Sequence, residues 1–266
     1  MECLLSDWDI EDLRSKYNTA KPFEYVIIPK FFTDDVAHDI YNVLPDPNES
    51  WWVYDNPFEN KYVLNEFTDN LKDIFDFVNS EVVLKRLRNI TNIPELENDP
   101  YFHAGGLHAY GRNGKCGLHL DYNIHPITYK ERRVSLMVYM CNNWKSEYGG
   151  KLELWDKNLT SKTVVDCDMW NTAILFKTNE INYHGIPDPI KCPSNIYRKV
   201  IGVYYMSEPT QKTLDSPRKG AVLIPTPGEK IDERLKLLYD LRKTRRLTPS
   251  DLDFWPTWKK DCGLLE

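Results

Sequence analysis

The sequence lacks the features of secreted, membrane-spanning and nucleic-acid-binding proteins. It has no long apolar run, and its amino terminus, "MECLLSDWDIED", is acidic, so we expect neither a signal peptide nor a membrane anchor. A net charge of −6 provides no broad basic face for nucleic acid. The short basic run "LRKTRR" (241–246) is interpreted as the solvated last turn of a helix, where cations suit the helix dipole. We therefore predict a cytoplasmic protein with no nucleic-acid partner.

Paired cysteines and linkers are also missing. The six cysteines form no C-x-x-C pair, which disfavours a structural zinc site and favours reduced thiols. We find no internal repeat, low-complexity tract or Gly/Ser linker. One domain over residues 1–266 is therefore expected. It divides into a helix-rich support (1–100), a core with the functional residues (101–208) and a tail with a helix (209–266).

Apolar residues at helical spacing predict three helical regions. Residues 33–44 open with a cap-like Thr and an acidic first turn, and residues 65–91 carry a second apolar stripe that Ser80 can restart as a new helix. A third helix is expected over residues 230–245. Its leucine stripe is typical of core packing or of a subunit contact, such as a homodimer through this helix.

Between residues 102 and 206 the pattern changes to short β-branched and aromatic runs separated by turn residues. These runs are "GLHAY", "RVSLMVYM", "KLELW", "TVVDC", "TAILF" and "KVIGVYYM". Strands at this spacing favour a sandwich or barrel over alternating βαβ units. The predicted fold class is mainly β with flanking helices (α+β), built on a double-stranded β-helix (jelly-roll) core.

The stretch "GLHLDYN" places His119 and Asp121 two residues apart. On a strand these side chains point to the same side and can share a metal ion, whereas alone they would be a surface His beside a loop Asp. His184, in "NEINYHGIPDP", supplies a third ligand. Two His and one carboxylate form the facial triad of non-haem iron oxygenases. A His₂Asp zinc hydrolase remains open, although the sequence has no His-Glu-x-x-His.

Arg198 is the residue that distinguishes an iron oxygenase from a zinc hydrolase. On the strand "YRKVIGVYYM" it shares a face with Val200 and Tyr204, and a buried Arg on such a strand requires an anionic partner. A guanidinium is well suited to bind a carboxylate. An exposed edge Arg would need no partner, but the position shortly after His184 favours a role in the same site.

In this order the residues resemble the Fe(II)/2-oxoglutarate-dependent dioxygenases, in particular their prolyl-4-hydroxylase-like branch. The segments that carry the resemblance are "YGRNGKCGLHLD", "RRVSLMVYMCNNW", "YGGKLEL", "YHGIPDP" and "YRKVIGVYY". Each segment is short, but the ordered set over residues 107–207 is specific. The resemblance implies a hydroxylase that uses Fe(II), with 2-oxoglutarate and O₂ as cosubstrates and ascorbate as a reductant.

The resemblance also implies a role for individual residues. His119, Asp121 and His184 would hold Fe(II), and Arg198 would bind the distal carboxylate of 2-oxoglutarate. Tyr139 looks like a hydroxyl donor to that same carboxylate.

Two features of the cosubstrate site leave alternatives open. Tyr110 matches a residue that lines the cosubstrate pocket, but it can equally be a core aromatic. The interval from His184 to Arg198 is longer than usual, so Lys199 is the alternative anchor if a bulge reverses the strand faces. The family's "YLN" has become "YMCN", which moves the Asn and leaves Tyr139 in place.

The resemblance does not identify the substrate. It implies hydroxylation of an unactivated C–H bond in a small molecule or a peptidyl side chain such as proline, since Asp121 stands where halogenating relatives have a small residue. Demethylation and desaturation use the same ligands, and an inactive jelly-roll binding module is the non-enzyme alternative. Candidate substrate contacts, which ordinary loop or core chemistry explains equally well, are Asn123, His125, Tyr129 and Trp155. The absence of an added recognition domain favours a small molecule.

Overall fold

The computed structural model of the chain describes residues 4–216 and 220–264. The helices are α1 (Ile10–Thr19), α2 (Asp34–Val43), α3 (Asp69–Val78), α4 (Glu81–Thr91), α5 (Gln211–Asp215), α6 (Glu233–Thr244) and α7 (Trp258–Asp261), with short 3-10 helices η2 (Ser146–Tyr148) and η3 (Pro249–Leu252). The strands are β1 (Tyr25–Ile28), β2 (Trp52–Asp55), β3 (Glu59–Leu64), β4 (Gly106–Tyr110), β5 (Lys115–Leu120), β6 (Glu131–Met140), β7 (Glu153–Trp155), β8 (Lys162–Val164), β9 (Trp170–Lys177), β10 (Tyr183–Ile186), β11 (Arg198–Ser207) and β12 (Val222–Leu223).

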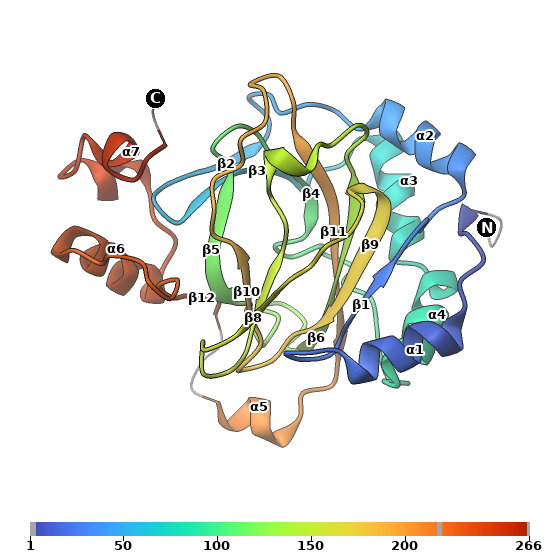
Figure 1. The fold of residues 1–266 in the computed structure, drawn as a ribbon. Coiled ribbons are helices and arrows are strands. Elements are labelled where there is room, and N and C mark those ends of the chain that lie inside the picture. The colour runs from blue at the N-terminus through green and yellow to red at the C-terminus, as the bar shows by residue number, and fades with distance from the viewer. Residues whose placement is uncertain (1–3, 217–219, 265–266) are drawn as a thin grey trace.

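The strands of the described residues form one antiparallel sheet that curls on itself. Its order is β1-β9-β6-β11-β4-β3-β5-β10-β7-β8, with β2 added beside β3 and β12 beside β5. The β9-β6-β11-β4 half therefore faces the β5-β10-β7 half, and β3 connects them (Figure 1). This arrangement, with helices on the flanks, confirms the predicted jelly-roll core.

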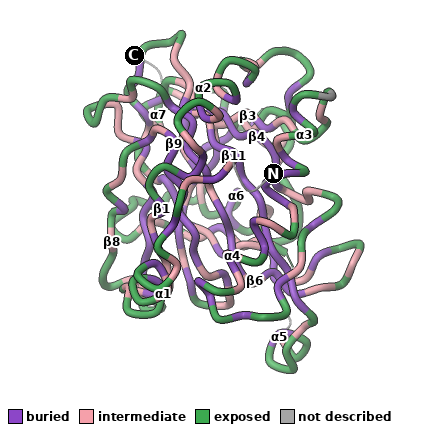
Figure 2. Tube along the Cα trace, turned by 90° about the vertical axis from the view of Figure 1, so that its right-hand side faces the viewer, coloured by how far each residue is buried: buried purple, intermediate pink, exposed green. Residues whose placement is uncertain are grey.

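The larger half of the sheet is buried on both faces. On β11, Ile201, Val203 and Tyr205 belong to the core cluster that α1 to α4 cover, whereas Val200 and Tyr204 point to the inside of the curled sheet. The alternation follows from the two-residue repeat of a strand. Figure 2 shows the buried positions along these strands and the exposed positions on the outer turns and loops. The helices thereby fix the strands whose inner side chains line the site.

The predicted helices are present, and α3 and α6 begin four and three residues later than predicted. The helix predicted at residues 33–44 is α2, and Ser80 separates α3 from α4 as expected. Helix α3 begins at residue 69 rather than 65, because Thr68, in extended conformation, is its N-cap residue and residues 65–67 connect it to the end of β3. β2 and β3 were not predicted, since their sequence carries no clear alternation.

The leucine stripe of α6 packs within its own chain. Leu238 is fully buried, and Leu235 and Leu241 lie against the same cluster. That cluster consists of Phe58, Leu223, Leu238, Tyr239, Leu252, Trp255, Trp258 and Leu264. Of the two readings of the stripe, core packing is confirmed; a homodimer contact through α6 stays a prediction. Among the described helices, none has the length and apolar character to span a membrane.

Candidate metal centre and cosubstrate cavity

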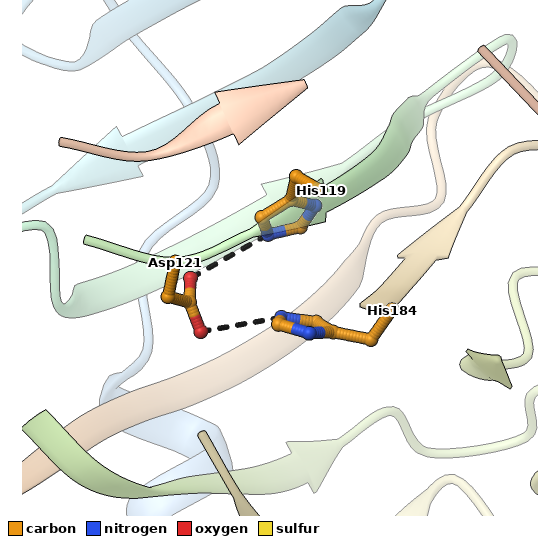
Figure 3. Close-up of side chains that lie close together, drawn as sticks. All are labelled: His119, Asp121 and His184. Carbon is orange, nitrogen blue, oxygen red and sulfur yellow. Dashed lines mark ion pairs between the residues drawn. The ribbon is translucent and has the colours of Figure 1, made fainter. Parts of the chain in front are cut away.

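Two neighbouring strands bring the predicted ligands together. His184 on β10 pairs directly with His119 on β5, and Asp121 follows the end of β5. Nε2 of His119 lies 3.5 Å from Oδ1 of Asp121, and Nε2 of His184 lies 3.3 Å from Oδ2 (Figure 3). The three ligand atoms lie within 4.8 Å of one another. The sequence prediction that these residues converge is therefore correct in geometry.

Backbone carbonyls orient both imidazoles. Nδ1 of His119 lies 2.9 Å from the Gly117 carbonyl oxygen, and Nδ1 of His184 lies 3.1 Å from the Asn182 carbonyl oxygen. With a proton on Nδ1 donated to the carbonyl, Nε2 of each ring would have its lone pair available for a metal ion shared with Asp121. Two imidazole nitrogens and one carboxylate, with the remaining positions open, fit a non-haem Fe(II) ion.

Gly185 explains why a glycine follows the second histidine. β5 has one residue more than β10 between the pairs His184–His119 and Ile186–Cys116, so the strands approach closely at Gly185. A Cβ at this position would lie 2.8 Å from the carbonyl oxygens of Cys116 and Gly117. Only glycine allows this approach, which sets the spacing of the two imidazoles.

Arg132, which the sequence analysis missed, is the charged partner of Asp121. Its Nη2 lies 2.8 Å from Oδ2 of Asp121 and donates to the Ser135 hydroxyl. The guanidinium carbon lies 3.3 Å from the ring centre of Tyr204. Burial by itself raises the pKa of the Asp121 carboxyl, but Arg132 and His184 together hold that pKa well below its usual range. Asp121 is therefore ionised and ready to bind a cation.

A β-bulge brings Arg132 to this position. Opposite β11, Tyr205 pairs with Val134 while Met206 pairs with Arg132, so Arg133 is an extra residue. Strict alternation would put Arg132 on the same side as Val134, under the helices. The bulge turns it to the inner side instead. No signal in the sequence marks the bulge, and this is why strand parity did not reveal Arg132.

Arg198 lies in an inner cavity that also contains the three ligands. Its guanidinium carbon is 5.1 Å from the ring centre of Tyr110 and 4.6 Å from that of Tyr139. Arg198 is only 2% exposed, and its Nε has no hydrogen-bond partner within the described structure. Within 4 Å of its guanidinium no carboxylate of the described residues is found. A buried cation of this kind fits the carboxylate of a bound ligand such as 2-oxoglutarate.

Lys199 points to the other side of the strand. Its Nζ donates to the Leu44 carbonyl and lies 2.7 Å from Oδ1 of Asp46, beside α2. The pairing of Arg198 with Tyr110 is regular, and the bulge of β6 lies opposite Tyr205 and Met206, at least seven residues further along β11. Strand parity therefore holds at this end of β11, and Arg198, not Lys199, faces the cavity.

The four residues expected to contact substrate lie elsewhere. The Asn123 amide donates to Glu180, and the buried His125 accepts from two backbone amides with Nδ1 while its Nε2 lies 3.3 Å from Asp99. Tyr129 is 72% exposed. Trp155 donates to Glu153. None of the four is found among the described residues that line the inner cavity or the cleft next to it.

Side chains from other strands complete the inner cavity. Lys61 on β3 and His108 on β4 both line it, and burial together with the charge of Lys61 lowers the pKa of His108 to about 3, so its ring is neutral. The sequence analysis missed Lys61, because β3 was not predicted as a strand.

Comparisons with known proteins agree with this geometry. Residues 105–206 match the family model described as the 2OG-Fe(II) oxygenase superfamily. No curated protein matches the sequence. Among solved structures, a 2OG-Fe(II) oxygenase family oxidoreductase from Burkholderia pseudomallei is similar at 13% identity, over 76% of this chain and 92% of that one, with a TM-score of 0.53.

A prolyl hydroxylase from Trichoplax adhaerens, solved with a peptide of hypoxia inducible factor, has 13% identity over 81% of this chain and 100% of that one, with a TM-score of 0.50. At this identity the two structures establish the fold alone. The family match covers the strands that carry the His, Asp and Arg residues described above. Residues 105–206 are similar to the 2OG-Fe(II) oxygenase superfamily, and the chain is an oxygenase that depends on Fe(II) and 2-oxoglutarate.

Proposed function

We propose that this enzyme hydroxylates an unactivated C–H bond of a small molecule or of a peptidyl side chain such as proline, with release of succinate and CO₂. His119, Asp121 and His184 hold the Fe(II) in this proposal, and Arg198 binds the distal carboxylate of 2-oxoglutarate. The observation that carries the proposal is the pairing of two incomplete sites in one cavity. A metal-ligand triad lies beside a buried guanidinium that has no carboxylate partner among the described residues.

Each protein group has a defined task in this reaction. Bound Fe(II) and 2-oxoglutarate would activate O₂, which is the oxidant for C–H cleavage. Arg132 keeps Asp121 ionised, and the backbone carbonyls at Gly117 and Asn182 orient the imidazoles. The buried Tyr139 stacks beside Arg198, and burial raises the pKa of its hydroxyl, so it stays protonated and can donate to the same carboxylate.

The Asp121→Ala substitution tests the proposal. With Fe(II), 2-oxoglutarate and O₂, the parent protein should release succinate, and candidate substrates should stimulate the release. The variant should lose it, because a ligand is removed. Asp166→Ala is the control, since its side chain is 82% exposed and pairs only with Lys151 among described residues. Turnover that requires neither O₂ nor 2-oxoglutarate, and that zinc supports in place of iron, would contradict the proposal and indicate a hydrolase.

A further inference from the structure

An outer cleft of about 600 Å³ opens beside the inner cavity. The two share a boundary, formed by Lys61, His108, His119, Asp121 and Tyr204. Any molecule that occupies the cleft therefore reaches the metal ligands. Its volume is in the range of small-molecule pockets, about 300–1,000 Å³. Arg242 of α6 and Arg246, which follows that helix, also line the cleft, so the C-terminal tail contributes to it.

The cleft is cationic although the whole chain is acidic. Four basic side chains line it, Lys61, Arg132, Arg242 and Arg246, against two carboxylates, Glu59 and Asp121. The net charge of the chain is −6. Concave surfaces lined by one sign of charge concentrate ligands of the opposite sign.

The carboxylates of the cleft are already engaged by protein cations. Asp121 pairs with Arg132, while the buried Glu59 is shared, with Lys61 at 3.4 Å and Nε of Arg242 at 3.5 Å. Glu59 thus holds a β3 lysine and an α6 arginine together. These three residues together therefore carry one excess positive charge, and Lys61 is the member of the group that lines both the cleft and the inner cavity.

Arg246 supplies a second uncompensated charge, at the mouth of the cleft. Its guanidinium carbon lies 5.9 Å from the ring centre of Trp52 and 5.6 Å from that of Tyr54. In the described part of the chain it has no ion pair. Lys61 lies 4.9 Å from the same Tyr54 ring. The two cations therefore lie around one aromatic ring, one deep and one at the rim.

The rim also carries apolar side chains that a soluble protein usually covers. Trp52, Tyr101 and Ile127 all line the cleft, and each is more than half exposed, at 57%, 54% and 53%. Aromatic rings at the mouth of a pocket provide stacking surface for a flat or apolar group. Cations and exposed rings together favour a ligand that has an anionic group and an apolar body.

We propose that the outer cleft is the substrate site and selects a small molecule in which a carboxylate or phosphate is joined to an apolar or aromatic body. Arg246 and Lys61 bind the anionic group, Trp52 and Tyr101 pack against the body, and the carbon to be oxidised faces His119. The inference rests on the proposed function and narrows its substrate class.

Calorimetric titration of the full chain tests this. Metal-loaded protein saturated with N-oxalylglycine, which occupies the 2-oxoglutarate position, is titrated with phenylacetate, phenyl phosphate and the uncharged phenylacetamide. Both anions should bind at least tenfold more tightly than the amide, and added salt should weaken their binding. The tighter of the two anions identifies carboxylate or phosphate as the headgroup. Equal affinity of anions and amide would overturn the inference.

Substitutions locate the binding. Arg246→Gln should weaken the anions about fivefold without affecting the amide, as expected for an exposed ion pair. Lys243→Gln removes a nearby exposed charge that pairs with Asp240, and should change nothing. Lys61→Met should weaken the anions roughly tenfold or more. If the Lys61→Met variant does not fold, the Arg246→Gln variant still tests whether anions bind in the cleft. Equal effects of the 246 and 243 substitutions would overturn the inference.

The test of the substrate class can fail independently of the test of the proposed function. N-oxalylglycine is first titrated alone, and its binding reports on the metal and Arg198. Failure of that titration contradicts the proposed function. Success of that titration, followed by anion binding that does not depend on Arg246, contradicts only the substrate class.

Discussion

At the scale of single residues, the site is controlled by two buried arginines with opposite tasks. Arg132 has its carboxylate partner in the protein, Asp121, while Arg198 has none among the described residues. In the proposed function, Arg132 therefore keeps Asp121 ionised for the metal, and Arg198 is available to bind the cosubstrate. Their sequence signals also differ, because Arg198 obeys strand parity and Arg132 depends on a bulge.

Replacement of Arg132 should weaken the metal site. Arg132→Met removes the charge that stabilises ionised Asp121 and leaves a buried carboxylate, so affinity for Fe(II) or Mn(II) should fall about 10–100-fold. The measurement is an anaerobic metal titration followed by calorimetry. Arg133→Gln is the control, since Arg133 points outward to Glu95 and Ser207. Metal affinity that is the same in both variants would rule out this role for Arg132.

Replacement of Arg198 should affect 2-oxoglutarate and not the metal. Arg198→Gln deletes a buried charged hydrogen bond to the ligand, which is worth on the order of 1.5–3 kcal/mol, or roughly a ten- to hundredfold rise in the Kd of 2-oxoglutarate. Lys199→Gln, which removes an outward charge paired with Asp46, should leave that Kd unchanged. The opposite ranking of the two variants would assign the anchor to Lys199.

At the scale of elements, the close approach of β5 and β10 sets the metal geometry. Gly185→Ala forces a Cβ against two backbone carbonyl oxygens at 2.8 Å, which cannot move as a side chain does. We expect a loss of about 1–3 kcal/mol in unfolding free energy and a weaker metal site. Gly111→Ala, whose Cβ would meet only the ring of Tyr197, is the comparison. Denaturant unfolding with and without metal measures both effects.

The elements also show how far the sequence determines the site. Strand periodicity placed His119 and Asp121 together and gave Arg198 its face, because the irregularity of β5 lies before His119 and β11 pairs regularly at Arg198. It could not reveal Arg132, whose position depends on one inserted residue. Nor could it reveal Lys61, because β3 lies between the two halves of the sheet and is neither apolar nor alternating. Loop positions such as His125 depend on tertiary partners that are distant in sequence.

At the scale of the whole molecule, the candidate metal ligands and Arg198 come from opposite halves of a curled sheet. His119 and His184 lie on β5 and β10, while Arg198 lies on β11, and β3 connects the halves. The C-terminal tail closes the outside through the Glu59–Arg242 pair and an Asn113 hydrogen bond to the Leu264 carbonyl. A cosubstrate bound between metal and Arg198 would therefore join the two halves.

Thermal unfolding should show this connection as two successive increases in Tm, one on addition of metal and one on addition of 2-oxoglutarate. Metal alone should stabilise the protein, and 2-oxoglutarate should add to that only when metal is present, because its keto-acid end needs the metal. At a ligand concentration 100 times its Kd the added stability is about 2.7 kcal/mol, or on the order of 5–10 °C in Tm. Arg198→Gln should keep the rise in Tm that metal causes and lose most of the further rise that 2-oxoglutarate causes. Asp121→Ala should lose both rises. A full 2-oxoglutarate step without metal would show that Arg198 holds the cosubstrate independently of the triad.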